Sequence, residues 1–287
     1  MKRYRFLSLL LVLFLSGCNS SNKKKTSKEQ YTAPAKYGVF LGCDSSSINK
    51  FKNYQNVVID LDSFDSNAIS TLKQNDCFIY SYLSIGSLEK YRTYYETYKN
   101  ITFMDYENWP NERWVDVSNS SWQEHLLSEA NRLKALGAEG LFMDNFDVYY
   151  IILEEYQGSD INKEDIYQGC LKILNDLSSI GLKLMINSGT DFLERMKDEN
   201  RPELNKIKVY AQETIFSKID DYENDVFSKQ DREEKEYLLS IVEFMRYYGD
   251  VLFIEYTKDE SLKSEIQSYC DEYGYHYYIS ENVDLKI

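Results

Sequence analysis

Short apolar runs alternate with amphipathic stretches along residues 37–287, and this order constrains the fold more than any other feature. Eight runs have the composition of strands: 37–42, 56–62, 77–86, 140–147, 182–187, 207–213, 251–256 and 275–280. Helical spacing occurs at 66–74, 121–136, 163–180, 231–248 and 260–273. Such alternation is typical of parallel strands joined by crossover helices. Eight units in about 250 residues predict an α/β fold with one (β/α)8 barrel domain, and a doubly wound open sheet is the alternative.

Residues 1–17 have the pattern of a bacterial lipoprotein signal peptide. Three basic residues precede the apolar run 7–15, which is too short to span a bilayer. The sequence Leu-Ser-Gly-Cys that ends at Cys18 resembles a lipobox, so we expect cleavage before Cys18 and a lipid on its sulfur. An ordinary signal peptide followed by a chance cysteine is the alternative. Polar residues 18–36 predict a tether, which would hold the domain 37–287 to a membrane of the cell envelope, outside the cytoplasm.

The charge of the chain restricts its partners. The formal net charge is −14, and the amino-terminal segment is rich in lysine, so the domain itself is more acidic still. This charge argues against nucleic acid as a partner. It would raise the local concentration of a cationic ligand, although most such charge serves solubility. We expect a monomer.

Histidines and cysteines do not have the spacing of a catalytic or metal site. His125 falls in a helical stretch and His276 in a strand-like run, and neither has a serine or cysteine partner at a recognisable spacing. The cysteines after Cys18 form no C-x-x-C pair, and the oxidising compartment allows three different pairings. They are Cys43, Cys77, Cys170 and Cys270. We therefore expect no metal or cofactor.

Polar residues collect where the strand-like runs end. The octet Gly140–Asp147 is the densest case, because Asp144, Asn145 and Asp147 follow an apolar run directly. A desolvated carboxylate must be paired, hydrated or neutralised, so we expect this cluster where the strand meets water. The other runs end in or near Asp62, Ser84, Asn187, Glu213 and Glu255. In a barrel these ends share one rim, which is where active sites lie.

A rim of carboxylates, amides and tyrosines suits glycoside hydrolysis. That reaction needs one carboxylic acid to protonate the leaving oxygen and a second carboxylate to attack or to activate water. Backbone-bonded carboxylates or rim salt bridges are the alternatives for such acids. The residues that we expect to bind substrate are Asp62, Tyr82, Asn145, Asp147, Asn187, Glu255 and Tyr256. Tyr82 and Tyr256 are equally compatible with sugar stacking and with packing, and Glu89 and Arg92 are predicted to form a structural ion pair on a helix.

Six segments resemble, in order, the motifs of the glycoside hydrolase family 114 barrels, the endo-α-1,4-polygalactosaminidases. They are 82–92, 109–117, 140–149, 184–189, Gln212-Glu213 and 254–256. The resemblance covers nearly all of 37–287. It implies that Asp144 and Glu213 are the catalytic carboxylates, and that the partner is a galactosamine-containing polysaccharide, cationic when partly deacetylated.

Two departures leave the exact sugar open. The segment after Glu213 lacks the cysteine of fungal members, and 148–181 is predicted to be an extended active-site loop. A barrel that binds carbohydrate without turnover, or a glycosidase for another α-linked polymer, are the alternatives. The sequence does not say which carboxylate is the acid; a carboxyl separation of about 5–5.5 Å would indicate retention and about 6.5–9.5 Å inversion.

Overall fold

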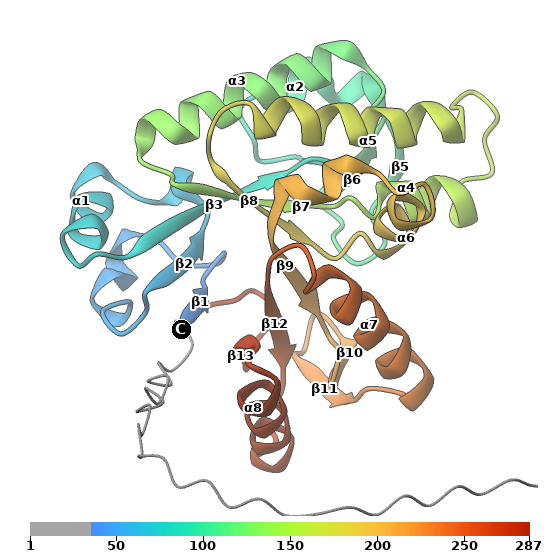
Figure 1. The fold of residues 1–287 in the computed structure, drawn as a ribbon. Coiled ribbons are helices and arrows are strands. Elements are labelled where there is room, and N and C mark those ends of the chain that lie inside the picture. The colour runs from blue at the N-terminus through green and yellow to red at the C-terminus, as the bar shows by residue number, and fades with distance from the viewer. Residues whose placement is uncertain (1–35) are drawn as a thin grey trace, which may run out of the picture. The chain divides into compact units, whose positions relative to one another are not determined.

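Eight parallel strands surround a common axis in the computed structural model, which describes residues 36–287 (Figure 1). They are β1 (Tyr37–Val39), β2 (Asn56–Ile59), β3 (Phe78–Ser84), β7 (Gly140–Asp144), β8 (Lys183–Asn187), β9 (Ile207–Glu213), β12 (Asp250–Tyr256) and β13 (His276–Ser280). Each strand pairs with the next in this order. Rings fill the junction between β1 and β13, where Phe40 meets Tyr278 with ring centroids 5.3 Å apart. The predicted barrel is confirmed, and the open sheet is not observed.

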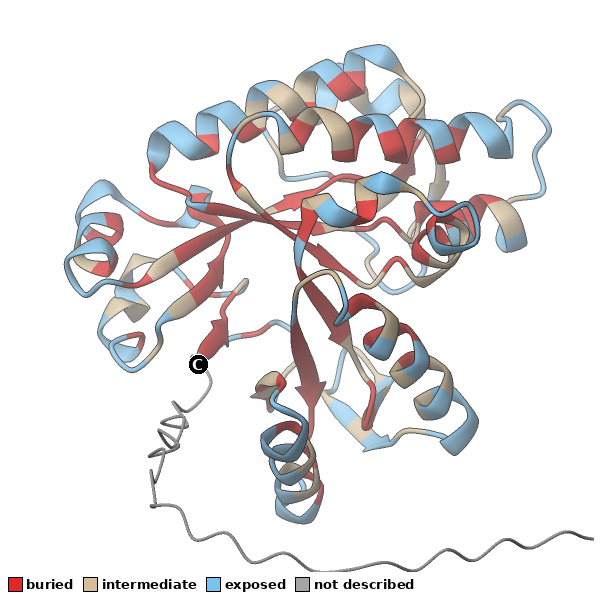
Figure 2. Ribbon diagram, in the orientation of Figure 1, coloured by how far each residue is buried: buried red, intermediate tan, exposed pale blue. Residues whose placement is uncertain are grey.

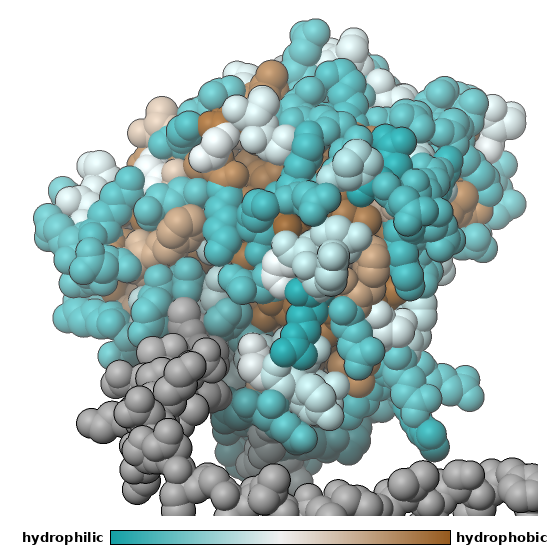
Figure 3. All heavy atoms as spheres, in the orientation of Figure 1, coloured by the Kyte–Doolittle hydropathy of each residue, from teal (hydrophilic) through white to brown (hydrophobic). Residues whose placement is uncertain are grey.

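Helices form the outer layer of the barrel. They are α1 (Ser66–Gln74), α2 (Tyr95–Tyr98), α3 (Ser120–Leu136), α4 (Val148–Tyr150), α5 (Lys163–Ser178), α6 (Thr190–Asp198), α7 (Arg232–Met245) and α8 (Glu260–Tyr273). Figure 2 shows buried residues along the strands and on the inward stripes of these helices. Hydrophilic side chains cover most of the face seen in Figure 3. Burial of the apolar stripes against the sheet is the main force that holds the two layers together.

Local signals set most helix ends. Gly137, with φ of +126°, ends α3, and Gly274, with φ of +74°, ends α8. A residue with no Cβ adopts such angles without strain. The sequence offers Ser66 as a plausible cap of α1, and this prediction is wrong by one residue. Asp65, not Ser66, caps this helix, because its carboxylate accepts a hydrogen bond of 2.8 Å from the backbone N–H of Ala68.

Two antiparallel insertions were not predicted. A three-stranded sheet, in the order β4-β6-β5, lies between β3 and α3, and a hairpin of β10 and β11 follows β9. Their strands are β4 (Ser87–Glu89), β5 (Thr102–Asp105), β6 (Glu112–Val115), β10 (Ser217–Asp221) and β11 (Val226–Lys229). Most of these runs are short and partly exposed, and the buried run β4 has only three residues, so none has the continuous apolar pattern that revealed the barrel strands.

Residues 148–181 do not form the predicted active-site loop. They form α4, a π-helical turn over Ile151–Glu155, and α5, and none of them lines the main cleft of the described chain. In Figure 1, α5 lies beside α3 on the outside of the barrel. The acids and tyrosines of this segment therefore belong to the outer layer.

The four cysteines of the described chain are buried free thiols, so none of the three possible pairings is present between residues 36 and 287. Cys18 lies outside the described residues. In the same range, no helix has the length and apolarity needed to cross a bilayer. No group of three or more His, Cys, Asp or Glu side chains there is arranged to hold a metal ion.

Candidate active site

A cleft of about 560 Å³ opens at the carboxyl ends of the barrel strands. The strand ends supply its floor, and the two antiparallel insertions and the carboxyl-terminal segment 283–286 supply its walls. The acidic residues that line it are Asp60, Glu89, Glu112, Asp144, Asp147, Glu213 and Asp284. Among the lining residues, Lys286 is the only base, and it is ion-paired to Asp284. The cleft therefore presents an excess of carboxylates to any ligand.

One amide joins the two predicted catalytic carboxylates. The side-chain nitrogen Nδ2 of Asn187 donates to Asp144 Oδ1 at 2.9 Å and to Glu213 Oε1 at 2.7 Å. The hydroxyl of Tyr256 donates to the other oxygen of Glu213 at 2.6 Å. We call Asp144 and Glu213 the amide-bridged pair. Since both oxygens bond one nitrogen, they lie no further apart than the two bonds placed end to end, about 5.6 Å.

The environment of the amide-bridged pair favours a shared proton. Burial and the neighbouring Glu213 raise the pKa of Asp144 from 3.8 to about 8, against the opposing effect of the Asn187 hydrogen bond. No described cation is ion-paired with either member. Burial likewise raises the pKa of Asp147 to about 6, and burial together with Glu89 raises the pKa of Glu112 to about 7. Asp144 is thus protonated near neutral pH and able to donate to a leaving group.

The chain turns sharply after three neighbouring strands, at the residues that follow the site side chains. Asn145 has φ of +68°, Ser188 of +50° and Thr214 of +56°, which are left-handed angles that cost non-glycine residues free energy. These residues follow Asp144, Asn187 and Glu213, respectively. Each turn thus begins directly after a strand-end side chain of the site, and the three turn residues themselves line the cleft.

Asn145 is held by protein groups. Its Nδ2 donates to Ser84 Oγ at 2.9 Å and to Ser87 Oγ at 3.0 Å, and its Oδ1 accepts from the Tyr106 hydroxyl at 3.2 Å. Asn145 lines the cleft, but its amide connects β7 to the three-stranded insertion. Asp147 also lines the cleft and accepts a bond of 3.2 Å from the backbone N–H of Gly189.

Two residues that we expected to bind substrate lie elsewhere. Glu255 has no exposed surface, and its carboxylate accepts bonds from the backbone N–H groups of residues 215–217 and from the Ser217 hydroxyl. It holds the base of the hairpin β10–β11 instead. Asp62 is absent from the cleft lining and pairs with Arg132 at 2.8 Å and with Arg92 at 3.3 Å. Asp62 and Glu255 therefore stabilise structure, which corrects both predictions.

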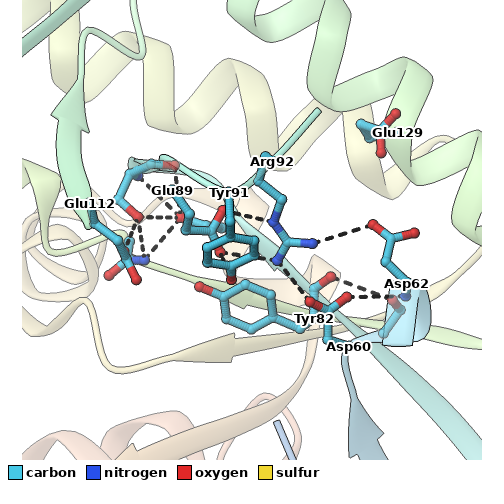
Figure 4. Close-up of polar contacts among 12 residues, drawn as sticks. Asp60, Asp62, Tyr82, Glu89, Tyr91, Arg92, Glu112 and Glu129 are labelled. Carbon is cyan, nitrogen blue, oxygen red and sulfur yellow. Dashed lines mark hydrogen bonds and ion pairs between the residues drawn. The ribbon is translucent and has the colours of Figure 1, made fainter. Parts of the chain in front are cut away.

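Asp62 belongs to a group that we call the arginine cluster: Asp60, Asp62, Glu89, Arg92 and Arg132. Figure 4 labels the first four of these residues. Arg92 is buried and bonds both oxygens of Glu89 at 3.0 Å and Asp60 at 3.0 Å. The predicted ion pair of Glu89 and Arg92 exists, but Glu89 lies on β4 and not on a helix. Figure 4 shows the rings of Tyr82 and Tyr91 beside this guanidinium.

The structure brings together, in one cleft, six of the residues that the sequence singled out: Tyr82, Asp144, Asn145, Asp147, Asn187 and Glu213, with Tyr256 as a seventh. Other lining residues had no predicted role, and four of them lie in the antiparallel insertions: Tyr106, Trp109, Glu112 and Tyr222. The resemblance at 109–117 includes Trp109 and Glu112 without giving them a role, and no sequence signal marked Tyr106 or Tyr222.

Comparisons with known proteins agree with this geometry. The model of the glycoside-hydrolase family GH114 matches residues 19–282. The glycoside hydrolase domain of PelA from Pseudomonas aeruginosa superposes with a TM-score of 0.73 at 18% identity, covering 89% of this chain and 97% of that one. Ega3 from Aspergillus fumigatus, in complex with galactosamine, gives 0.67 at 17% identity, covering 91% and 96%. An α-galactosidase from Thermus thermophilus gives 0.55 at 10% identity, covering 89% and 60%. No protein of curated function matches the sequence.

Proposed function

Because the chain belongs to glycoside hydrolase family GH114, we propose that it cleaves internal bonds of an α-linked, galactosamine-containing polysaccharide with Asp144 and Glu213. The observation that carries this proposal is the single amide that holds both carboxylates at the floor of one cleft. A glycosidic bond needs two such groups on opposite sides of the anomeric carbon.

The separation of the pair favours retention of anomeric configuration. An upper limit of about 5.6 Å between the bridged oxygens is below the range of about 6.5–9.5 Å that leaves room for an attacking water. In the retaining route, one carboxylate attacks the anomeric carbon while the other carboxyl group protonates the departing oxygen. Water then hydrolyses the glycosyl ester, and the second carboxylate takes up its proton. The proton needed for the first step is present near neutral pH, because the pKa of Asp144 is raised to about 8.

The charge of the cleft supports a cationic amino sugar as substrate. Glu112 and Asp147 lie in the lining without an ion pair to any described lysine or arginine, and the one lining base is paired to Asp284. A protonated amino group on galactosamine loses water when it binds, and these carboxylates would take the place of that water. The galactosamine bound to Ega3 makes this sugar the first one to test.

The decisive experiment measures the reducing ends released from a partly deacetylated α-1,4-galactosamine polysaccharide. Wild-type protein is compared with Asp144→Asn and Glu213→Gln, and circular dichroism checks that both variants fold. We expect a loss of about 1,000-fold or more in each variant, because each removes a group that exchanges a proton or a bond with the substrate. If wild-type protein releases nothing but binds the polymer, the chain is a carbohydrate-binding barrel.

Two further measurements assign the mechanism. Proton NMR of the first product should show the α-anomer, as retention requires. Azide should rescue glycine variants at positions 144 and 213 differently: the variant that lacks the nucleophile should form a β-glycosyl azide, and the variant that lacks the acid should form an α-glycosyl azide. A β-anomer as first product would contradict the retaining route.

We also propose that Cys18 carries a lipid and holds the protein, as a monomer, to the cell envelope outside the cytoplasm. The motif before Cys18 supports this. Labelling with an alkyne fatty acid should mark the wild-type protein and not Cys18→Ser. Gel filtration in detergent tests the monomer.

A further inference from the structure

Two insertions reach the same cleft from strands on either side of the reactive residues. The loop 106–111 belongs to the three-stranded insertion after β3, and the turn 222–225 belongs to the hairpin after β9. In the strand order, β3 and β9 flank β7 and β8, which carry Asp144 and Asn187. Both insertions line the cleft through aromatic side chains.

The two insertions meet through one pair of rings. Trp109 and Tyr222 contact each other edge to face, with ring centroids 6.0 Å apart and an angle of 80° between the ring planes. Both side chains are half-buried and both line the cleft. We call this pair the aromatic bridge. Because its rings come from opposite walls of one cleft, their contact spans that cleft.

The bases of the insertions are held more firmly than the bridge. Tyr106 stacks on Trp114 at 4.2 Å and donates to Asn145, which ties the loop 106–111 to β7. The buried carboxylate of Glu255 accepts bonds from the start of the hairpin. A single edge-to-face ring contact is weak by comparison with these buried hydrogen bonds. The bridge should therefore open at a lower free-energy cost than the bases of the two insertions.

We propose that the aromatic bridge is a clamp for one sugar ring of the polysaccharide, which enters by separating Trp109 from Tyr222. This inference rests on the proposed function for its ligand class. The remaining lining is rich in carboxylates and hydroxyls, which bind the polar groups of a sugar, whereas the indole and phenol offer faces for the apolar C–H groups of a pyranose. Rings in direct contact leave no space for a pyranose between them, so binding requires opening. Trp109 and Tyr222 then give the protein its preference for long polysaccharide chains, which extend beyond the bond being cleaved, over short glycosides.

The first test compares a long with a short substrate. Trp109→Ala, Tyr222→Ala and the double variant are assayed on the partly deacetylated α-1,4-galactosamine polysaccharide and on 4-nitrophenyl α-galactosaminide. We expect kcat/KM on the polymer to fall about tenfold more than on the small glycoside, mainly through KM. The double variant should lose little more than the worse single variant, because both rings hold one sugar. Tyr247→Ala, a tyrosine that is 86% exposed and outside the cleft lining, is the matched control.

The second test holds the bridge closed. Trp109→Cys and Tyr222→Cys are combined in one protein, and the two new thiols are joined by a bifunctional maleimide with a reducible linker. The four native cysteines of the described chain should not react, because they are buried. Polymer cleavage should fall in the linked protein and return after reduction, and the single-cysteine variants serve as controls. Unchanged cleavage of polymer by the linked protein, or an unchanged KM in the alanine variants, would overturn the clamp.

A binding measurement separates failure of the clamp from failure of the proposed function. Affinity electrophoresis in gels that contain the same polysaccharide compares Asp144→Asn with Asp144→Asn/Trp109→Ala. This measurement reports binding alone, so neither variant needs to cleave the polymer. Weaker retardation of the second protein supports the clamp even if wild-type protein releases no reducing ends. Equal retardation contradicts the clamp even if wild-type protein is fully active.

Discussion

Two groups of carboxylates share one rim of the barrel, and they differ in what surrounds them. In the arginine cluster, Asp60, Asp62 and Glu89 are neutralised by guanidinium groups at 2.8–3.3 Å. In the amide-bridged pair, Asp144 and Glu213 receive hydrogen bonds only from a neutral amide, a phenol and a backbone N–H.

The difference separates structural acids from those that we propose to be catalytic. A carboxylate beside arginine stays ionised and is inert as a proton donor, because the cation stabilises the charged form. A carboxyl beside another carboxyl, in a partly buried site without a cation, holds its proton up to higher pH. The sequence shows acids at strand ends in both groups, so the position of the arginines decides which acids can do chemistry.

The largest effect that we expect on stability comes from the arginine cluster. Arg92→Met should lower the free energy of unfolding by about 3–5 kcal/mol, because it leaves the buried Glu89 carboxylate without its cation. Urea unfolding measures this change. A loss below about 1 kcal/mol would mean that Glu89 is neutralised in another way, and the contrast between the two groups would fail.

A smaller effect should follow at the amide-bridged pair. Asn187→Ala should lower kcat about 100-fold with little change in KM, because the two carboxyls lose the donor that fixes their separation. The alkaline limb of the pH profile should move to higher pH, since the Asn187 bond lowers the pKa of Asp144. Gln123→Ala is the matched control, as Gln123 is a buried amide that bonds the Val117 carbonyl at 2.8 Å, away from the cleft. An unchanged pH profile would show that Asn187 does not affect the pKa of Asp144 and serves only packing.

Stability as a function of pH sharpens the comparison further. The pKa of Asp144 is about 8 in the folded protein and 3.8 as a reference, so the folded state binds this proton more tightly than the unfolded state. Wild-type protein should therefore lose stability, relative to Asp144→Asn, as pH rises from about 4 to 8.

The difference between the two proteins should be near zero at pH 4 and should reach at least about 1 kcal/mol above pH 8, where Asp144→Asn is the more stable. Thermal unfolding across this pH range measures it. Glu213→Gln should show a weaker pH dependence than wild type, because it removes a charge that raises the pKa of Asp144. If Asp144→Asn is less stable than wild type at every pH, ionised Asp144 does not destabilise the folded protein.

The smallest effect distinguishes two arginines that bond the same carboxylate. Arg132 is 40% exposed and pairs with Asp62, which is also 40% exposed, whereas the side chain of Arg92 is 9% exposed. Arg132→Met should cost less than about 1 kcal/mol, because solvent already screens the pair. Urea unfolding of Arg132→Met and Arg92→Met, measured side by side, tests this. Equal losses of unfolding free energy would show that burial does not control the strength of these ion pairs.

The sequence by itself determined the barrel. Its eight apolar runs and the helices between them agree with the observed elements, because parallel strands buried on both faces leave an apolar signature that needs no knowledge of distant contacts. It also placed Asp144, Asn187 and Glu213 at the ends of successive strands, and in a barrel such ends must share one rim.

Only the tertiary structure decided what each rim residue contacts. Glu255 ends a strand as Glu213 does, yet β12 buries it against the backbone of residues 215–217, while Tyr256 reaches the cleft. Asp62 meets Arg132 from 70 residues away along the chain. The half-exposed insertions that bring Trp109 to Tyr222 carry no strong periodic pattern. Ion pairs, amide bridges and ring contacts depend on distances between segments remote in sequence, and a local pattern contains no information about those distances.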